Sequence, residues 1–155
     1  MSPSLFELSI LLVEDSSADA ALLTRYLQQV LGKINLQWVT EGETALEILQ
    51  AQWEDQDSKS QDSPSQDSRS IDLLILDLNL PGLSGREVFA LLTADPTLCH
   101  LPVVILTTAL YDQDILPIPS QPHYCYYLKP TQLSEYATVC QKIADFWATL
   151  SSLSF

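Results

Sequence analysis

The chain has 155 residues, which fits a single domain, and 46% of them are hydrophobic, which is enough for a packed core. Twenty Asp and Glu residues against seven Lys and Arg residues give a formal net charge of −13. Such an acidic surface repels phosphate backbones and anionic lipid headgroups, so we expect neither nucleic acid nor a membrane as a partner.

Location follows from the apolar segments and the cysteines. No stretch approaches the roughly 20 apolar residues of a membrane-spanning helix, and no basic segment precedes the first apolar run. The three cysteines, Cys99, Cys125 and Cys140, are widely spaced and form no Cys-x-x-Cys pair. We therefore expect reduced thiols in a cytoplasmic protein.

Short apolar runs alternate with helical patterns along the chain. The Asp15-Ser16-Ser17 segment offers N-cap residues to the first helix and Gly32 offers a C-cap. Strand–helix alternation implies right-handed crossovers, so the sequence predicts an α/β fold with a doubly wound, five-stranded parallel sheet and flanking helices on both faces. The predicted strands are 8–13, 36–40, 71–76, 101–106 and 124–128, and the predicted helices are 18–31, 42–53, 85–94 and 131–150.

A low-complexity segment separates the second helix from the third strand. Residues 56–70 read QDSKS, QDSPS and QDSRS in succession, with almost no apolar content and with Pro64 inside. Such a segment cannot offset the entropy lost on ordering. We expect residues 54–70 to form a flexible inserted loop; a Ser-rich stretch regulated by phosphorylation is the alternative.

Polar side chains follow four of the predicted strands. Glu14 and Asp15 end the first strand, Asp77 the third, Thr107 the fourth and Lys129 the fifth. The carboxyl ends of parallel strands share one edge of the sheet, where ligands bind in open α/β folds. Three clustered carboxylates repel one another unless a cation intervenes, and Mg²⁺ prefers oxygen ligands of this kind. Each residue alone has a simple structural explanation, but their joint occurrence predicts a site.

Four segments carry a resemblance to a known family. LLVEDS, ILDLNLPGLSG, VVILTT and YYLKP resemble the four signatures of the response-regulator receiver domain, a flavodoxin-like fold, and together they extend over nearly the whole chain. The resemblance implies that Asp77 is the phosphoacceptor and that Mg²⁺ is the cofactor. It also implies that Asp15 and Asp77 bind the ion directly, that Glu14 acts through water, and that Asn79 supplies a backbone carbonyl.

The same resemblance assigns the remaining site residues. Thr107 and Lys129 would bind phosphoryl oxygens, and Tyr126 matches the aromatic switch position three residues before the lysine. The implied function is a single-domain response regulator that accepts a phosphoryl group from a sensor histidine kinase and signals by protein contact. It would catalyse only its own phosphorylation and dephosphorylation, so we do not class it as an enzyme.

Two alternatives stay open from the sequence. A pseudo-receiver would act as a protein-binding module without phosphorylation. A small Mg²⁺-dependent phosphatase of the doubly wound class would also use an aspartate nucleophile. Such phosphatases usually carry Asp-x-Asp, and here Asn79 occupies the second position.

The subtype is indicated near the C-terminus. Asp145-Phe146-Trp147 and the long loop before the phosphoacceptor strand look like features of the small regulators paired with phytochromes, which implies a phytochrome-type kinase as partner. An exposed Phe146-Trp147 pair would favour a homodimer or a kinase-docking face. Core packing against the sheet is the alternative.

One segment departs from the family pattern. Between Thr107 and Lys129 a receiver normally carries its fourth helix, but this stretch contains Pro117, Pro119 and Pro122. Proline inside a helix costs about 3 kcal/mol or more. We expect at most one helical turn near 111–116, with a Pro-rich segment replacing the rest of that helix.

Overall fold

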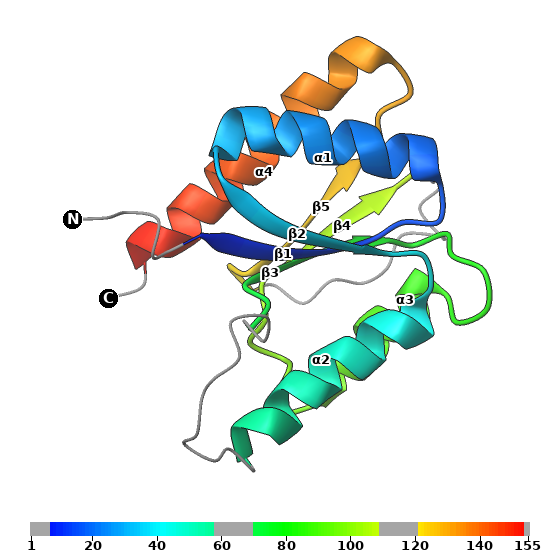
Figure 1. Cartoon of the computed structure of the whole chain (residues 1–155), viewed down its shortest axis with the longest axis vertical. Coiled ribbons are helices and arrows are strands. Elements are labelled where there is room, and N and C mark those ends of the chain that lie inside the picture. The colour runs from blue at the N-terminus through cyan, green and yellow to red at the C-terminus, as the bar shows by residue number, and fades with distance from the viewer. Residues whose placement is uncertain (1–6, 58–69, 109–120, 154–155) are drawn as a thin grey trace.

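The computed structural model describes residues 7–57, 70–108 and 121–153, and these contain one parallel sheet (Figure 1). The order of the five strands is β2-β1-β3-β4-β5, so the chain passes from the centre to one edge and then back across to the other. The strands are β1 (Leu8–Val13), β2 (Ile34–Val39), β3 (Leu73–Asp77), β4 (Val103–Thr107) and β5 (Tyr124–Leu128).

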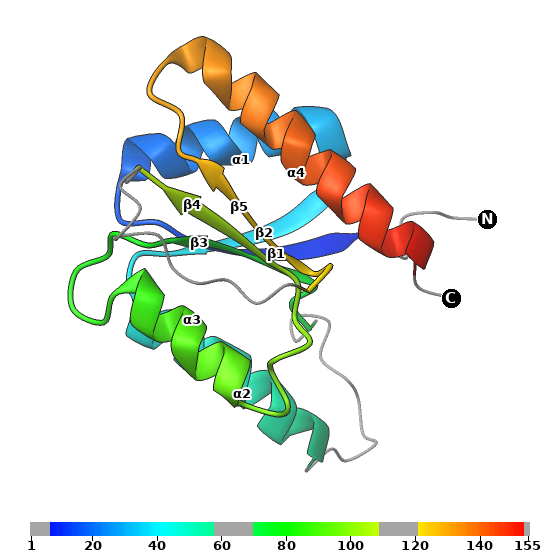
Figure 2. The ribbon, with the colours of Figure 1, turned by 180° about the vertical axis from the view of Figure 1, so that it is seen from behind.

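Helices cover both faces of this sheet. Helices α1 (Ser17–Leu31) and α4 (Leu133–Leu153) lie together on one face, and α2 (Gly42–Asp57) and α3 (Gly85–Ala94) lie on the other (Figures 1 and 2). The predicted doubly wound α/β fold is therefore confirmed. Among the helices of the described residues, none is long and apolar enough to cross a membrane.

The core consists of two layers, one on each side of the sheet. Successive side chains of a strand point to opposite faces, so Leu11 and Val13 pack toward α2 and α3, whereas Ile10 and Leu12 pack toward α1 and α4. Burial on both sides explains why β1, β3 and β4 read as continuous apolar runs rather than as alternating ones.

Most element boundaries agree with the sequence within two or three residues. Strand β2 begins at Ile34 instead of residue 36, because it pairs along the whole of β1, from Leu8 opposite Ile34 to Val13 opposite Val39. Helix α2 continues to Asp57, four residues beyond its predicted end, because the helical hydrogen-bond ladder continues where the apolar periodicity has stopped. Residues 54–57 are therefore helix rather than loop.

Three expectations concern other parts of the chain. The rest of the predicted loop, residues 58–69, and the predicted helical turn at 111–116 lie outside the described residues. Phe146 and Trp147 are half-buried against the core between the sheet, α1 and α4. Their position favours core packing over the exposed aromatic pair that a docking face would need.

The topology sets the position of the site. Strands β1 and β3 are neighbours at the centre of the sheet, yet the chain leaves β1 toward β2 and returns through β3 to the opposite half. The carboxyl end of the β1–β3 pair is therefore the topological switch point, at which ligand crevices form in this class of fold. The residues that follow these two strands meet there.

Candidate functional site

Three acidic side chains meet at the switch point. Glu14 and Asp15 follow β1 and Asp77 ends β3, and one carboxylate oxygen from each lies within 4.8 Å of the other two. Glu14 and Asp77 are buried, with 0% and 2% of their surfaces exposed, whereas Asp15 is exposed. Two buried carboxylates and one solvent-exposed carboxylate therefore lie close together.

Lys129 brings a positive charge to the two buried acids. Its Nζ lies 2.9 Å from Oδ2 of Asp77 and within 2.9 Å of Glu14, and only 8% of the residue is exposed. The backbone N–H of Lys129 donates to the carbonyl of Thr107 at 2.8 Å, which extends the β4–β5 pairing and directs the lysine toward β3. The ammonium thus forms ion pairs with both carboxylates in one buried network.

The environment changes the proton affinities of this network. Burial raises the pKa of Glu14 to about 7, Asp77 adds to the rise, and the hydrogen bonds from Lys129 and the Ser16 N–H oppose it. Burial alone would lower the pKa of Lys129, but its hydrogen bonds to Glu14 and Asp77 outweigh that effect and hold its pKa above the ordinary value. The lysine therefore remains a cation.

Backbone groups fix the orientation of Asp77. Oδ1 of Asp77 accepts the N–H of Asn79 at 3.0 Å, while Oδ2 faces Lys129. Gly85, at the start of α3, lies directly behind Asp77: a Cβ added there would be 2.2 Å from the Asp77 carbonyl oxygen and 2.5 Å from Cα of Leu78. The only residue that allows α3 to approach so closely is glycine.

The acidic cluster fits a hard divalent cation. Oε1 of Glu14 lies 2.8 Å from the Lys129 ammonium, but it makes no hydrogen bond although it is buried. A buried carboxylate oxygen without a hydrogen bond has lone pairs left for a metal or a metal-bound water. Asp15 and Asp77 supply further oxygens close by, so the donor set is the all-oxygen type that Mg²⁺ and Mn²⁺ accept.

The other predicted site residues lie around this centre. Thr107, at the end of β4, is 6% exposed and lies one residue beyond Leu106, the partner of Asp77 in the sheet. The side-chain amide of Asn79 donates to the Thr108 hydroxyl at 3.1 Å, which links the β3 and β4 ends. Tyr126, on the edge strand β5, is 47% exposed and pairs with Ile105.

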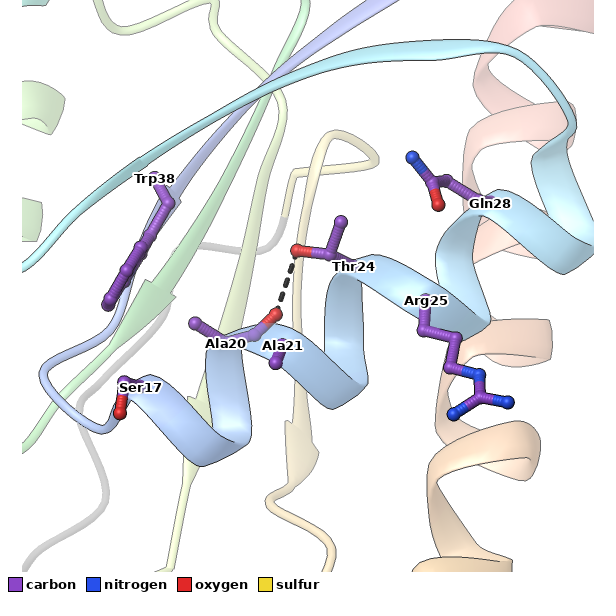
Figure 3. A pocket seen from close by; sticks show the side chains of 7 residues that line it. All are labelled: Ser17, Ala20, Ala21, Thr24, Arg25, Gln28 and Trp38. Atoms are coloured by element: carbon purple, nitrogen blue, oxygen red, sulfur yellow. Dashed lines mark hydrogen bonds between the residues drawn. The ribbon is translucent and has the colours of Figure 1, made fainter.

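A separate cavity of about 370 Å³ lies beside the site, between α1 and the end of β2 (Figure 3). Trp38 forms one wall, and its indole N–H donates to the backbone carbonyl of Glu14 at 2.7 Å. Ala21, Thr24 and Arg25 line the other side, and Arg25 is the one ionisable residue among those that line the cavity. The cavity lining therefore contains none of the clustered carboxylates that meet at the switch point.

Sequence reasoning missed two residues of the network. Asp19, on the first turn of α1, lies 3.2 Å from the Lys129 ammonium, and the Tyr136 hydroxyl of α4 donates to Asp19 at 2.6 Å. Asp19 is also the third residue after the N-cap Ser16, where acidic residues are common because they stabilise the helix N-terminus. Because stabilisation of the helix N-terminus already explains an acidic residue at this position, the sequence did not indicate the ion pair of Asp19 with Lys129.

Comparison with known proteins identifies the class that this fold and site define. The family model for the response regulator receiver domain matches residues 10–139, and the chain belongs to that family. The chain is therefore a signalling domain of a two-component system. Receiver domains bind a divalent metal at an acidic pocket, and the cluster of Glu14, Asp15 and Asp77 could hold such an ion.

Individual relatives agree with this assignment. The chain is 35% identical to the response regulator Rcp1 of Synechocystis sp. over 89% of this chain and 87% of Rcp1. Its structure is similar to that of the phosphorylated cyanobacterial phytochrome response regulator RcpA, with a TM-score of 0.73 and 31% identity over 94% of this chain and 96% of RcpA. The Mn²⁺-bound form of Rcp1 gives a TM-score of 0.69 at 35% identity, over 90% of this chain and 93% of that structure.

Proposed function

We propose that this receiver accepts a phosphoryl group on Asp77 from the phosphohistidine of a sensor kinase, in a Mg²⁺-dependent reaction, and signals by protein contact. The observation that carries the proposal is the double role of the Asp77 carboxylate. It belongs to the acidic cluster that fits a divalent cation, and it is also a direct partner of the buried Lys129 ammonium. A carboxylate between two cationic positions is suited to accept an anionic phosphoryl group.

The reaction is an exchange of one bond to phosphorus for another. A carboxylate oxygen of Asp77 attacks phosphorus as the P–N bond to the donor imidazole breaks, and the imidazole leaves with the electron pair of that bond. Charge in such a transition state spreads over the phosphoryl oxygens, so positioning and charge stabilisation carry most of the catalysis. Lys129 is held 2.9 Å from Oδ2 of Asp77 and can stabilise the incoming oxygens without a large movement.

Mg²⁺ would be held by the carboxylates of Asp15 and Asp77, by the backbone carbonyl of Asn79 and, through water, by Glu14. When bound, the ion supplies charge neutralisation for the phosphoryl oxygens. The carboxylate oxygen of Glu14 that makes no hydrogen bond supports its part in this set. The N–H of Asn79 keeps Oδ1 of Asp77 in a fixed direction, which leaves the orientation of the nucleophile independent of the ion.

The conformational response follows from Thr107 and Tyr126. After phosphorylation the Thr107 hydroxyl donates to a phosphoryl oxygen, and Tyr126 turns from its exposed position toward the space that Thr107 has left. The half-exposed ring of Tyr126 lies on the edge strand, where it is accessible to a partner. The two arrangements of β4 and β5 therefore present different surfaces, and this difference is the signal.

The proposed partner is a phytochrome-type histidine kinase in the cytoplasm. The similarity to RcpA, a phytochrome response regulator, and to Rcp1 supports this choice. No homodimer enters the proposal, because Phe146 and Trp147 are half-buried in the core and offer no exposed aromatic pair.

The test is the intact mass of the protein after incubation with acetyl phosphate, with and without Mg²⁺. We expect one phosphoryl adduct that requires Mg²⁺, is abolished by EDTA and is absent from Asp77→Asn. Asp145→Asn, the same change at an exposed position of α4, is the matched control and should form the adduct normally. Absence of an adduct on the wild type under every condition would replace the proposal with the pseudo-receiver.

A further inference from the structure

The Lys129 ammonium has a third carboxylate partner outside the acidic cluster. Oδ2 of Asp19 lies 3.2 Å from Nζ, in addition to Glu14 and Asp77 at 2.9 Å. An ammonium has three N–H donors, and here one carboxylate from each of three segments of the chain faces them. The Lys129 side chain is only 9% exposed, so this arrangement leaves the ammonium little freedom to turn.

Asp19 is itself held on its other side. Its Oδ1 accepts the hydroxyl of Tyr136 at 2.6 Å, and its backbone N–H donates to the side chain of Ser16 at 3.2 Å. Tyr136 is 4% exposed and stacks on Tyr26 of α1, with 6.3 Å between the ring centroids. The hydroxyl therefore comes from a packed position, and Asp19 cannot rotate away from Lys129 without breaking this partly buried hydrogen bond.

The charge of Asp19 is secure in this setting. Burial alone would raise its pKa, but the hydrogen bonds from Tyr136 and Lys129 outweigh burial and hold the pKa of Asp19 below its ordinary value. Asp19 is also distinct from the other two partners of the lysine, because only Glu14 and Asp77 belong to the cluster that fits a metal. A change of charge at Asp77 would therefore alter one lysine partner, while Asp19 would keep its own charge.

We propose that Asp19 is a positioning residue for phosphoryl transfer: it holds the Lys129 ammonium where the phosphoryl oxygens arrive, and Tyr136 of α4 holds Asp19. This inference rests on the proposed function. Preorganised charge contributes most to catalysis when no reorganisation is needed during the reaction. Because Tyr136 belongs to α4, the position of that helix enters directly into the chemistry at Asp77.

The first experiment measures the rate of adduct formation with acetyl phosphate at saturating Mg²⁺, at a temperature where every variant is fully folded by its thermal melt. Loss of a charge-assisted hydrogen bond in Asp19→Asn should slow the reaction about tenfold, and loss of the supporting hydroxyl in Tyr136→Phe about threefold. Asp145→Asn and Tyr26→Phe are the matched controls and should react within about twofold of the wild type. A purely structural role would lower the melting temperature and leave these rates unchanged.

The second measurement is the ¹H–¹⁵N signal of the lysine ammonium groups. An ammonium held by three partners exchanges its protons slowly, so Lys129 should give an observable signal, assigned by its loss in Lys129→Met. We expect the signal to broaden or vanish in Asp19→Asn, to shift in Tyr136→Phe and to persist in Asp145→Asn.

The adduct rate and the ammonium signal together distinguish failure of the Asp19 inference from failure of the proposed function. If the wild type forms the adduct but Asp19→Asn reacts at the wild-type rate with an unchanged ammonium signal, the inference fails and the proposed function survives. If the wild type forms no adduct, the proposed function fails and the inference fails with it, whatever the ammonium signal shows. Slow transfer together with a lost signal in Asp19→Asn supports both.

Discussion

The two helical layers reach Asp77 by different means. On the α2/α3 side the approach is backbone against backbone, with Gly85 so close to the Asp77 carbonyl that no side chain fits between them. The N–H of Gly85 donates to the carbonyl of Leu78 at 3.0 Å and joins α3 to the segment after Asp77. On the α1/α4 side the approach is made by charged and polar side chains: Lys129, Asp19 and Tyr136.

We call the α2/α3 layer the fixed side, because it contacts Asp77 through backbone atoms. We call the α1/α4 layer the adjustable side, because it contacts Asp77 through side chains. A backbone contact without intervening side chains permits no alternative packing, because protein interiors are close-packed and transmit strain. Side chains linked by hydrogen bonds can exchange partners when a new charge arrives at Asp77. We therefore expect the α2/α3 layer to hold the acceptor in place and the α1/α4 layer to respond to its phosphorylation.

The largest effect is expected from removing the positive charge of the adjustable side. Lys129→Met leaves the buried carboxylates of Glu14 and Asp77 without their cation, which should cost about 3–5 kcal/mol of unfolding free energy in metal-free buffer, measured by urea denaturation. Mg²⁺ should then stabilise the variant more than the wild type, because the ion no longer competes with an ammonium for the same oxygens.

Lys142→Met is the matched control for this change. Lys142 is an exposed residue of α4 whose Nζ lies 6.0 Å from the centre of the Tyr127 ring. Losing such a contact costs about 0.5–1 kcal/mol. Equal losses in the two variants would show that the buried network at Lys129 contributes no more to folding than a surface charge does.

The second largest effect is expected from a substitution on the fixed side, where Gly85 packs against the backbone of Asp77. Gly85→Ala should cost about 3 kcal/mol, because the added methyl meets the backbone of Asp77 and Leu78 and cannot be accommodated by a rotamer change. It should also slow adduct formation, since α3 or the acceptor strand has to shift. Thermal melts and the acetyl phosphate assay measure the two consequences.

Gly82→Ala, in the loop between β3 and α3, is the control that distinguishes a steric clash from the cost of a positive φ. Gly82 has a φ of +69°, and the atom nearest to a Cβ there would be Oε2 of the flexible Glu43 side chain, at 3.2 Å. The cost is then conformational, about 1–2 kcal/mol, and the acceptor should keep its reactivity. An equally slow Gly82→Ala would contradict the view that Gly85 supports Asp77 by close approach.

The sequence predicted elements well where burial is symmetric. Strands β1 and β3 are buried on both faces and appear as continuous apolar runs, so their positions follow from the sequence within two residues. Strand β2 contains only exposed and half-buried residues, and its start was misplaced. The end of α2 was missed for a related reason, because only apolar periodicity had been used to mark it.

The site divides in the same way. Glu14, Asp77 and Lys129 were predictable because each directly follows a strand, and the parallel topology brings strand ends together. Asp19 was not predictable, because its position on the first turn of a helix already had a sufficient explanation. Its hydrogen-bond partner Tyr136 is 117 residues away and shows no sequence signature beyond a core aromatic residue.

A smaller effect should appear when the adjustable side is tested for internal coupling. Tyr136→Phe removes a hydroxyl that donates to Asp19 and should cost about 1 kcal/mol of unfolding free energy. Combined with Asp19→Asn, the double variant should be less destabilised than the sum of the single ones, by at least about 0.5 kcal/mol. Simple additivity of the two changes would mean that the contact between α1 and α4 through these side chains does not contribute to folding.

The smallest expected effect concerns the packing between α1 and α4 during signalling. Cys140 is fully buried, its Sγ faces the Leu23 carbonyl at 3.9 Å, and burial raises the pKa of its thiol to about 12. At pH 8 almost no thiolate forms, and reactivity should rise only as pH approaches the raised pKa.

Iodoacetamide should therefore label the half-buried Cys99 and leave Cys140 unmodified, as peptide mass mapping can determine. The phosphorylated protein should give the same result, because partner exchange among Lys129, Asp19 and the phosphoryl group requires only side-chain movements of an ångström or two. Labelling of Cys140 on phosphorylation would instead show that α4 separates from α1. The response would then be a movement of the whole helix rather than a rearrangement of the side chains that link it to Asp77.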